Sequence, residues 1–135
     1  MGTDTLAAVL VGTTELSILT ALLFRAGLDN ALRGPGPYTL FAPSNHAFAR
    51  LRPGILTALR ADPPRLLAVL SDHLVPGALV AADLMAVSAL TALSGVQLTI
   101  TSTHGLRVEQ SYLTQADQLA ANGVLHLIDA VLLLR

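Results

Sequence analysis

The segment that most constrains the fold is Tyr38–Phe48, which has the sequence YTLFAPSNHAF. Its first five residues are mostly apolar and β-prone, so they predict a short strand. Pro43 has no backbone N–H for a sheet ladder and should end that strand. Ser44 or Asn45 can then cap a short helix that Phe48 anchors. A strand that turns directly into a helix marks the joint between a helical portion and a sheet portion.

The residues before this joint predict helices. Thr5–Val11 should form a short apolar helix that the following glycine ends. Thr13 or Thr14 should cap a longer helix, because its leucines recur at helical spacing. Gly27 suits the C′ position that ends this helix, and one more helical turn should follow before the loop at residues 34–37.

The central part of the chain also has helical character. Pro53 suits the first position of one helix, and Asp62 suits the N-cap of the next, ahead of two prolines. Leucines and His73 form an apolar stripe on that second helix. The sequence Val75-Pro76-Gly77 should break it, and mainly sheet is expected afterwards.

Two later segments, residues 96–101 and 106–109, alternate apolar and polar side chains and predict half-buried strands. A three-residue loop between them, with Gly105 in the left-handed conformation, keeps the apolar residues on one face. That register places Ile100 opposite Val108. It also places Leu98 opposite Gln110.

The last part of the chain is the most apolar. Asn122-Gly123 predicts a tight turn. After it, Val124–Leu134 is apolar apart from His126 and Asp129, which predicts a strand buried on both faces. A carboxylate inside such a strand needs backbone N–H groups or an arginine as a partner.

Composition bounds the class of protein. With 135 residues, 53% hydrophobic and 13% charged, the chain most simply forms a single domain over residues 1–135. A net charge of −1 gives no reason to expect nucleic acid or an anionic membrane as a partner. The lack of cysteine excludes thiol catalysis, disulfides and thiolate metal sites. The mean hydropathy of +0.62 is high, which leaves apolar surface to be covered, for instance in a homodimer.

The apolar runs near the N-terminus do not predict a membrane span. Leu6–Val11 is too short to cross a bilayer, and polar residues separate it from Leu16–Phe24. Neither run follows the basic region that opens a signal peptide. We therefore expect no transmembrane segment in this chain, and an exported form would need a leader outside it.

Three segments together resemble the fasciclin (FAS1) domain family. Tyr38–Phe48 is similar to the first motif of that family, and Asn122–Leu133, with the sequence NGVLHLIDAVLL, is similar to the second. Between them, Leu70–Gly77 (LSDHLVPG) is similar to the central Tyr-His region. The order and spacing of the segments fit one such domain over nearly the whole chain, so the first and last segments should pair or pack at the centre of the sheet.

The resemblance implies an α+β fold in which N-terminal helices pack on a seven-stranded β wedge or sandwich. It also implies a non-enzymatic adhesion or interaction module that binds a protein or an extracellular-matrix partner. Such a module would be secreted, periplasmic or cell-surface, and no cofactor is implied. Some members of the family bind lipophilic pigments, so a carrier of a carotenoid or lipid is the alternative function.

The resemblance also selects motif residues with structural or interaction roles. These are Tyr38, Thr39, Phe41, Ala42, Pro43, Phe48, His73, Pro76, Gly77, Asn122, Gly123, His126 and Asp129. Asp72, Asp117 and Leu119 are further interaction candidates. Asp72 departs from the family, which often has tyrosine there, in a Tyr-His region tied to integrin adhesion in animal members.

Serine, histidine and aspartate occur without the arrangement that a hydrolase or a metal site needs. The chain has no Gly-x-Ser-x-Gly elbow, and helix capping explains Ser44 more simply than nucleophilic attack does. The histidines lack metal-ligand spacing. His73 and His126 should instead be buried imidazoles with hydrogen-bond partners. Four arginines of the central helices predict a solvated face or a grip for carboxylates of a partner, namely Arg50, Arg52, Arg60 and Arg65.

Overall fold

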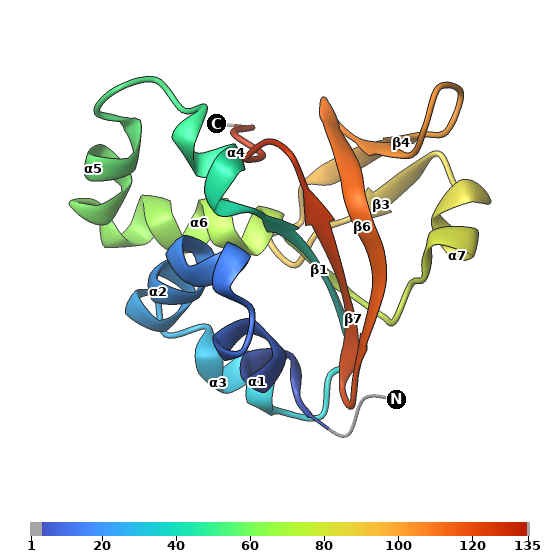
Figure 1. Cartoon of the computed structure of the whole chain (residues 1–135), viewed down its shortest axis with the longest axis horizontal. Coiled ribbons are helices and arrows are strands. Elements are labelled where there is room, and N and C mark those ends of the chain that lie inside the picture. The colour runs from blue at the N-terminus through green and yellow to red at the C-terminus, as the bar shows by residue number, and fades with distance from the viewer. Residues whose placement is uncertain (1–3, 135) are drawn as a thin grey trace.

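The computed structural model describes residues 4–134, in which helices pack against a seven-stranded sheet (Figure 1). The helices are α1 (Leu6–Val11), α2 (Ser17–Arg25), α3 (Asp29–Arg33), α4 (Asn45–Ala49), α5 (Ile55–Arg60), α6 (Pro63–Asp72) and α7 (Ala81–Met85), with a 3₁₀ turn, η1, at Thr14–Leu16. The strands are β1 (Tyr38–Pro43), β2 (Leu74–Pro76), β3 (Ala89–Thr91), β4 (Gln97–Thr101), β5 (Arg107–Val108), β6 (Ser111–Ala120) and β7 (Gly123–Ile128). The predicted α+β class, helices first and strands later, is confirmed.

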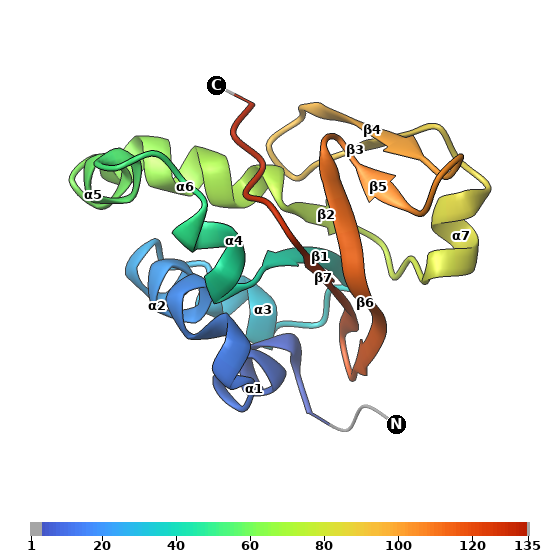
Figure 2. The ribbon, with the colours of Figure 1, turned by 45° about the horizontal axis from the view of Figure 1, so that its top comes forward.

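The strand order is β2-β1-β7-β6-β5-β4-β3, and only β1 and β7 pair in parallel among the described strands. The two motif segments therefore form neighbouring strands, with Tyr38 opposite Gly123 and Pro43 opposite Ile128. The sheet folds over on itself, because the N–H of Leu93, just after β3, donates to the carbonyl of Leu74 on β2 at 2.6 Å. The two outermost strands thus come together, as a wedge requires (Figure 2).

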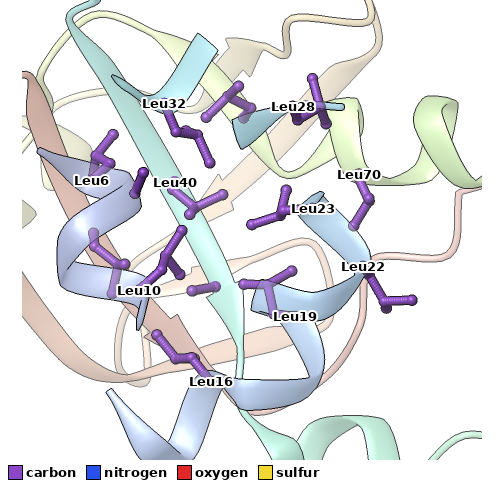
Figure 3. Close-up of a cluster of buried hydrophobic side chains, with 14 of the residues drawn as sticks. Leu6, Leu10, Leu16, Leu19, Leu22, Leu23, Leu28, Leu32, Leu40 and Leu70 are labelled. Carbon is purple, nitrogen blue, oxygen red and sulfur yellow. The ribbon is translucent and has the colours of Figure 1, made fainter. Parts of the chain in front are cut away.

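The strands β1 and β7 separate two hydrophobic cores. Alternate side chains of these strands, such as Leu40 and Leu125, face the leucines of α1, α2 and α3. Figure 3 shows those leucines gathered around Leu40. The intervening side chains, Phe41 and Ile128, face a second core enclosed by the folded sheet. This arrangement explains why every residue of β7 is buried.

Several predicted helix ends are confirmed. The helix α1 ends at Gly12 as predicted, but it begins at Leu6, because Thr5 is its N-cap and accepts from the N–H of Ala8 at 3.3 Å. Ser44 caps α4 through the N–H of Ala47 at 3.2 Å, and Asp62 caps α6. Gly27, with φ of +79°, follows the end of α2 as expected.

The start of α2 corrects the prediction. Neither Thr13 nor Thr14 caps this helix, because a 3₁₀ turn separates them from it, and the Thr13 hydroxyl donates back to the carbonyl of Val9. The cap comes from elsewhere in the chain: Oδ1 of Asn45, on α4, accepts from the N–H of Ile18 at 3.0 Å. This orphan donor is therefore satisfied by tertiary contact.

The central helices also differ from the prediction in two places. Pro53 does not begin a helix, because α5 starts at Ile55 with Gly54 before it at φ of +87°. The residues Leu74–Pro76 do not merely break α6; they form β2, which pairs with β1. A three-residue strand has too few residues to show a period of two in the sequence.

In the second half, the predicted register is confirmed, with Ile100 opposite Val108 and Gly105 at φ of +92°. The connection is longer than the predicted three residues, because β4 ends at Thr101 and β5 begins at Arg107. The further pairing of Leu98 with Gln110 is wrong. Glu109 adopts φ of +55° and turns the backbone out of the ladder, so β5 ends at Val108.

The final strand is shorter than predicted, since β7 ends at Ile128 and residues 129–134 lie outside the sheet. The turn also differs, because Gly123 is the first residue of β7 and pairs with Ala120. Within residues 4–134, each helix falls short of the length and apolar character that crossing a bilayer would require.

Candidate functional site

Two motif side chains, Thr39 and His126, and the carboxylate of Asp117 hold the segment that follows β2, residues 77–81. Thr39 is buried on β1 and holds this segment twice: its hydroxyl donates to the carbonyl of Gly77 at 2.6 Å and accepts from the N–H of Leu79 at 2.8 Å. Gly77 turns the chain with φ of +103° directly after the exposed Pro76. A single hydroxyl therefore fixes the exit from β2 against β1.

His126 holds the same segment from β7. Its Nδ1 accepts from the N–H of Asp117 at 3.1 Å, so the proton of the neutral ring is on Nε2, which donates to the carbonyl of Leu79 at 2.7 Å. The side chain is fully buried, as predicted. Burial lowers the pKa of His126 below its usual value, although the bond to Leu79 and the Asp117 charge oppose that shift.

Asp117 completes this group from β6. Its Oδ1 accepts from the N–H of Ala81 at 2.7 Å, at the start of α7. The residue has φ of +62° and lies at an irregularity in the pairing of β6 with β7, which aims its N–H at His126. Leu119, two residues further along β6, is exposed and lies apart from these contacts.

His73 is the second buried motif histidine, and it has the opposite tautomer. Its Nε2 accepts from the N–H of Leu132 at 2.9 Å, so Nδ1 carries the proton and donates to the carbonyl of Val69 at 2.8 Å. Burial lowers the pKa of His73 to about 4, against the opposing effects of the Val69 bond and the Asp72 charge. The ring thus ties the end of α6 to the segment after β7.

The neighbouring Asp72 is also fully buried. Its Oδ1 accepts from the hydroxyl of Ser94 at 2.5 Å. The position proposed for interaction therefore faces inward, toward the turn after β3, and a partner of the protein has no access to its carboxylate.

Asn122 joins three elements next to the last motif. Its Oδ1 accepts from the N–H of Leu6 at the start of α1, and its Nδ2 donates to the carbonyl of Leu32, within α3, and to that of Gly34, just beyond α3. Its own carbonyl accepts from the N–H of Tyr38, which is half-buried. The side-chain amide therefore connects α1, α3 and β7. These bonds account for an asparagine at this position more directly than a tight turn does.

Gly123 allows the two motif strands to approach each other. A Cβ at this position would lie 1.9 Å from the carbonyl oxygen of Tyr38. This distance is too short for any side chain, so only glycine fits here. The remaining apolar motif residues are buried within the fold, namely Phe41, Ala42, Pro43 and Phe48.

Asp129 corrects another expectation, because it lies just beyond β7 and is partly exposed. It has the kinds of partner that the sequence required. Its Oδ1 accepts from the N–H of Tyr112 at 2.9 Å and from the Ser111 hydroxyl at 3.3 Å. Arg50 lies 4.0 Å from Oδ2 and donates to the Asp129 carbonyl at 2.9 Å.

The residues considered for nucleophilic or metal chemistry have structural or exposed positions. Ser44 is engaged in capping α4, and the nearby His46 is exposed. No group of three or more histidines and carboxylates in residues 4–134 could hold a metal ion.

The feature that sequence reasoning missed is an open apolar groove on α1 and α2. A pocket of about 450 Å³ is lined by residues of both helices, and a second of about 430 Å³ adjoins it. Both share Val11, which is 66% exposed, and Phe24, which is 39% exposed. The guanidinium of Arg33 lies 5.3 Å from the Phe24 ring centroid. Helical periodicity alone gave no signal, because an apolar stripe does not show which of its edges stays uncovered.

A sequence model for the fasciclin domain matches residues 14–134. The chain belongs to the fasciclin domain family. Its fasciclin fold is shared with a FAS1 domain pair from the insect cell adhesion molecule fasciclin I, at a TM-score of 0.78 and 15% identity, covering 98% of this chain and 51% of that one.

Two fasciclin relatives illustrate the range of chain lengths. The Synechocystis protein sll1735 is 36% identical over 126 residues, which cover 93% of this chain and 95% of that protein. The transforming growth factor-beta-induced protein ig-h3 of Sus scrofa is also 36% identical, over 129 residues, but this match covers 19% of its length.

Proposed function

We propose that the chain is a non-enzymatic fasciclin module that binds a protein or extracellular-matrix partner at the cell surface or outside the cell. The observation that carries this proposal is the use of the polar motif residues within the fold. Thr39, His73, Asn122 and His126 are all buried and hydrogen-bonded to other parts of the chain. These polar side chains stabilise the fold of the domain, so we expect a partner to be bound by other residues, on the surface.

The relationship to fasciclin I supports an adhesive role, since that protein is described as a cell adhesion molecule. We infer one module over residues 1–135 that works without a cofactor. Ester hydrolysis that is lost in Ser44→Ala would contradict the non-enzymatic proposal.

We place the proposed contact surface at the α1–α2 groove, because Val11 and Phe24 expose apolar area there, with the Arg33 guanidinium over the Phe24 ring at its edge. Beads coated with the domain should retain envelope fragments of the source cells. Val11→Asp should weaken that retention. Met85→Asp, at a 63% exposed residue on α7, is the matched control and should leave retention unchanged. Equal retention by Val11→Asp and Met85→Asp would show that the groove is not the contact surface.

A carrier of a small lipophilic ligand is the second candidate, and the groove volume of about 450 Å³ favours it. Delipidated protein should then take up a carotenoid or fatty acid, and Val11→Asp should reduce uptake. Failure of the wild-type domain to take up either ligand would exclude the carrier function. Analytical ultracentrifugation of the wild-type domain and of Val11→Asp would also show whether a homodimer covers this face.

A further inference from the structure

The carboxylate of Asp117 lies between two groups on different elements. Its Oδ1 accepts from the N–H of Ala81 at 2.7 Å, where α7 begins. The same oxygen lies 3.9 Å from Nδ1 of His126 on β7. In the neutral ring this nitrogen has no proton, because it accepts from the N–H of Asp117. The carboxylate therefore bonds to α7 and not to the imidazole.

A proton on Nδ1 would reverse these preferences. Nδ1 would become a donor and could no longer accept from the N–H of Asp117. The imidazolium would instead attract the Asp117 carboxylate, which is already close to it. The same carboxylate oxygen would then be drawn away from Ala81.

Few charged groups among the described residues face the imidazole of His126. From β6, Asp117 is the carboxylate that faces the ring. From β1, the neighbour is Phe41, which does not titrate and stacks on the imidazole. From the segment before α7 comes the carbonyl of Leu79. Asp83, the acid on α7 itself, accepts from the N–H of Val80 at 3.1 Å.

We propose that Asp117 and His126 form a proton-operated latch that holds α7, the segment from Ala81 to Met85, against the sheet. In the closed state Asp117 bonds to Ala81. In the open state it pairs with protonated His126, and the segment loosens.

Opening the latch would uncover apolar surface. Leu84 on α7 is fully buried in the second core together with Phe41. Met85 and Val87 next to it are already exposed. Burial lowers the pKa of His126, so the latch stays closed at neutral pH and opens in acid. This inference is independent of the proposed adhesive function, since it concerns an intramolecular equilibrium.

NMR titration of the full chain tests the proposal, because it reports on His126 and Ala81 separately. Ring ¹⁵N shifts report the protonation of His126, and amide exchange, corrected for its intrinsic pH dependence, reports the bond from Ala81. We expect the Ala81 amide to lose protection as His126 gains its proton, while the amides of β7 stay protected. Protection of Ala81 that persists after His126 is protonated would overturn the proposal, as would loss of protection at all of these amides together.

Two variants that leave the buried ring in place sharpen the test. Asp117→Asn keeps an oxygen that can accept from Ala81, and asparagine tolerates a positive φ, but the attraction to the imidazolium is removed. Ala81 should therefore stay protected in acid, and the pKa of His126 should fall further. Asp83→Asn is the control, because it removes a carboxylate from α7 itself without touching the ring. In Asp83→Asn the Ala81 amide should lose protection at the same pH as in wild type. Loss of protection at that pH in Asp117→Asn would refute the latch.

Discussion

The ring of Phe41 on β1 stacks on the imidazole of His126 on β7, with centroids 5.8 Å apart and 25° between the planes. Both side chains have no exposed surface. This contact joins the first fasciclin motif to the last inside the folded sheet. The aromatic face also covers the neutral imidazole on a side where hydrogen bonds cannot reach it.

Phe41→Ala should reduce the free energy of unfolding by about 3–5 kcal/mol, because it removes a fully buried ring and leaves a cavity. Chemical denaturation at neutral pH measures this loss. Leu119→Ala is the control, since its side chain is 45% exposed, and it should change stability by no more than about 0.5 kcal/mol. A loss below about 1 kcal/mol for Phe41→Ala would show that the ring is not part of the core.

Gly123→Ala should disrupt the pairing of β1 with β7, since its Cβ would fall 1.9 Å from the Tyr38 carbonyl oxygen. We expect a destabilisation of at least about 1–3 kcal/mol, the usual cost of overpacking. Gly12→Ala is the matched control, because φ there is −81° and the nearest atom to its Cβ is 3.6 Å away. Thermal unfolding should show a lower Tm for the first variant only. Equal Tm values would contradict the close approach.

Asn45→Ala should expose the role of the cap that α4 supplies to α2. Removing Oδ1 leaves the N–H of Ile18 without its acceptor, which should cost about 0.5–2 kcal/mol. Asn45→Asp keeps an acceptor and should cost less. Amide exchange at Ile18 measures the local effect directly. Unchanged exchange in Asn45→Ala would show that the cap does not stabilise α2.

Stability should fall with acidification because of His73. Its folded pKa of about 4 lies below the usual 6.5, so the unfolded state binds the proton first. Its contribution is complete above pH 6.5 and is lost progressively down to about pH 4. The loss amounts to about 3 kcal/mol. Denaturation at several pH values should give a shallower slope across this window for His73→Gln. An identical slope would mean that His73 does not titrate between the two states.

The first motif shows why much of the fold could be predicted. Strand, proline stop, serine cap and phenylalanine anchor are local features, and all appear in β1 and α4 as expected. The errors have a common cause in longer-range contacts. The cap of α2 comes from Asn45, and β2 exists because β1 pairs with it. The candidate surface was missed because exposure of Phe24 depends on which neighbours fail to cover it.

The sequence alone was enough to predict the family, the α+β class, the alternation of buried residues and the burial of His73 and His126. These properties follow from local propensity and from the cost of burying charge. The partners of each polar group, by contrast, depend on how the helices and strands assemble. Thr39 lies far from Asp117 and His126 in the chain, yet all three hold one segment because β1, β6 and β7 are assembled in one sheet. The parallel pairing of β1 with β7 brings Thr39 and His126 together, and the bulge in β6 supplies Asp117.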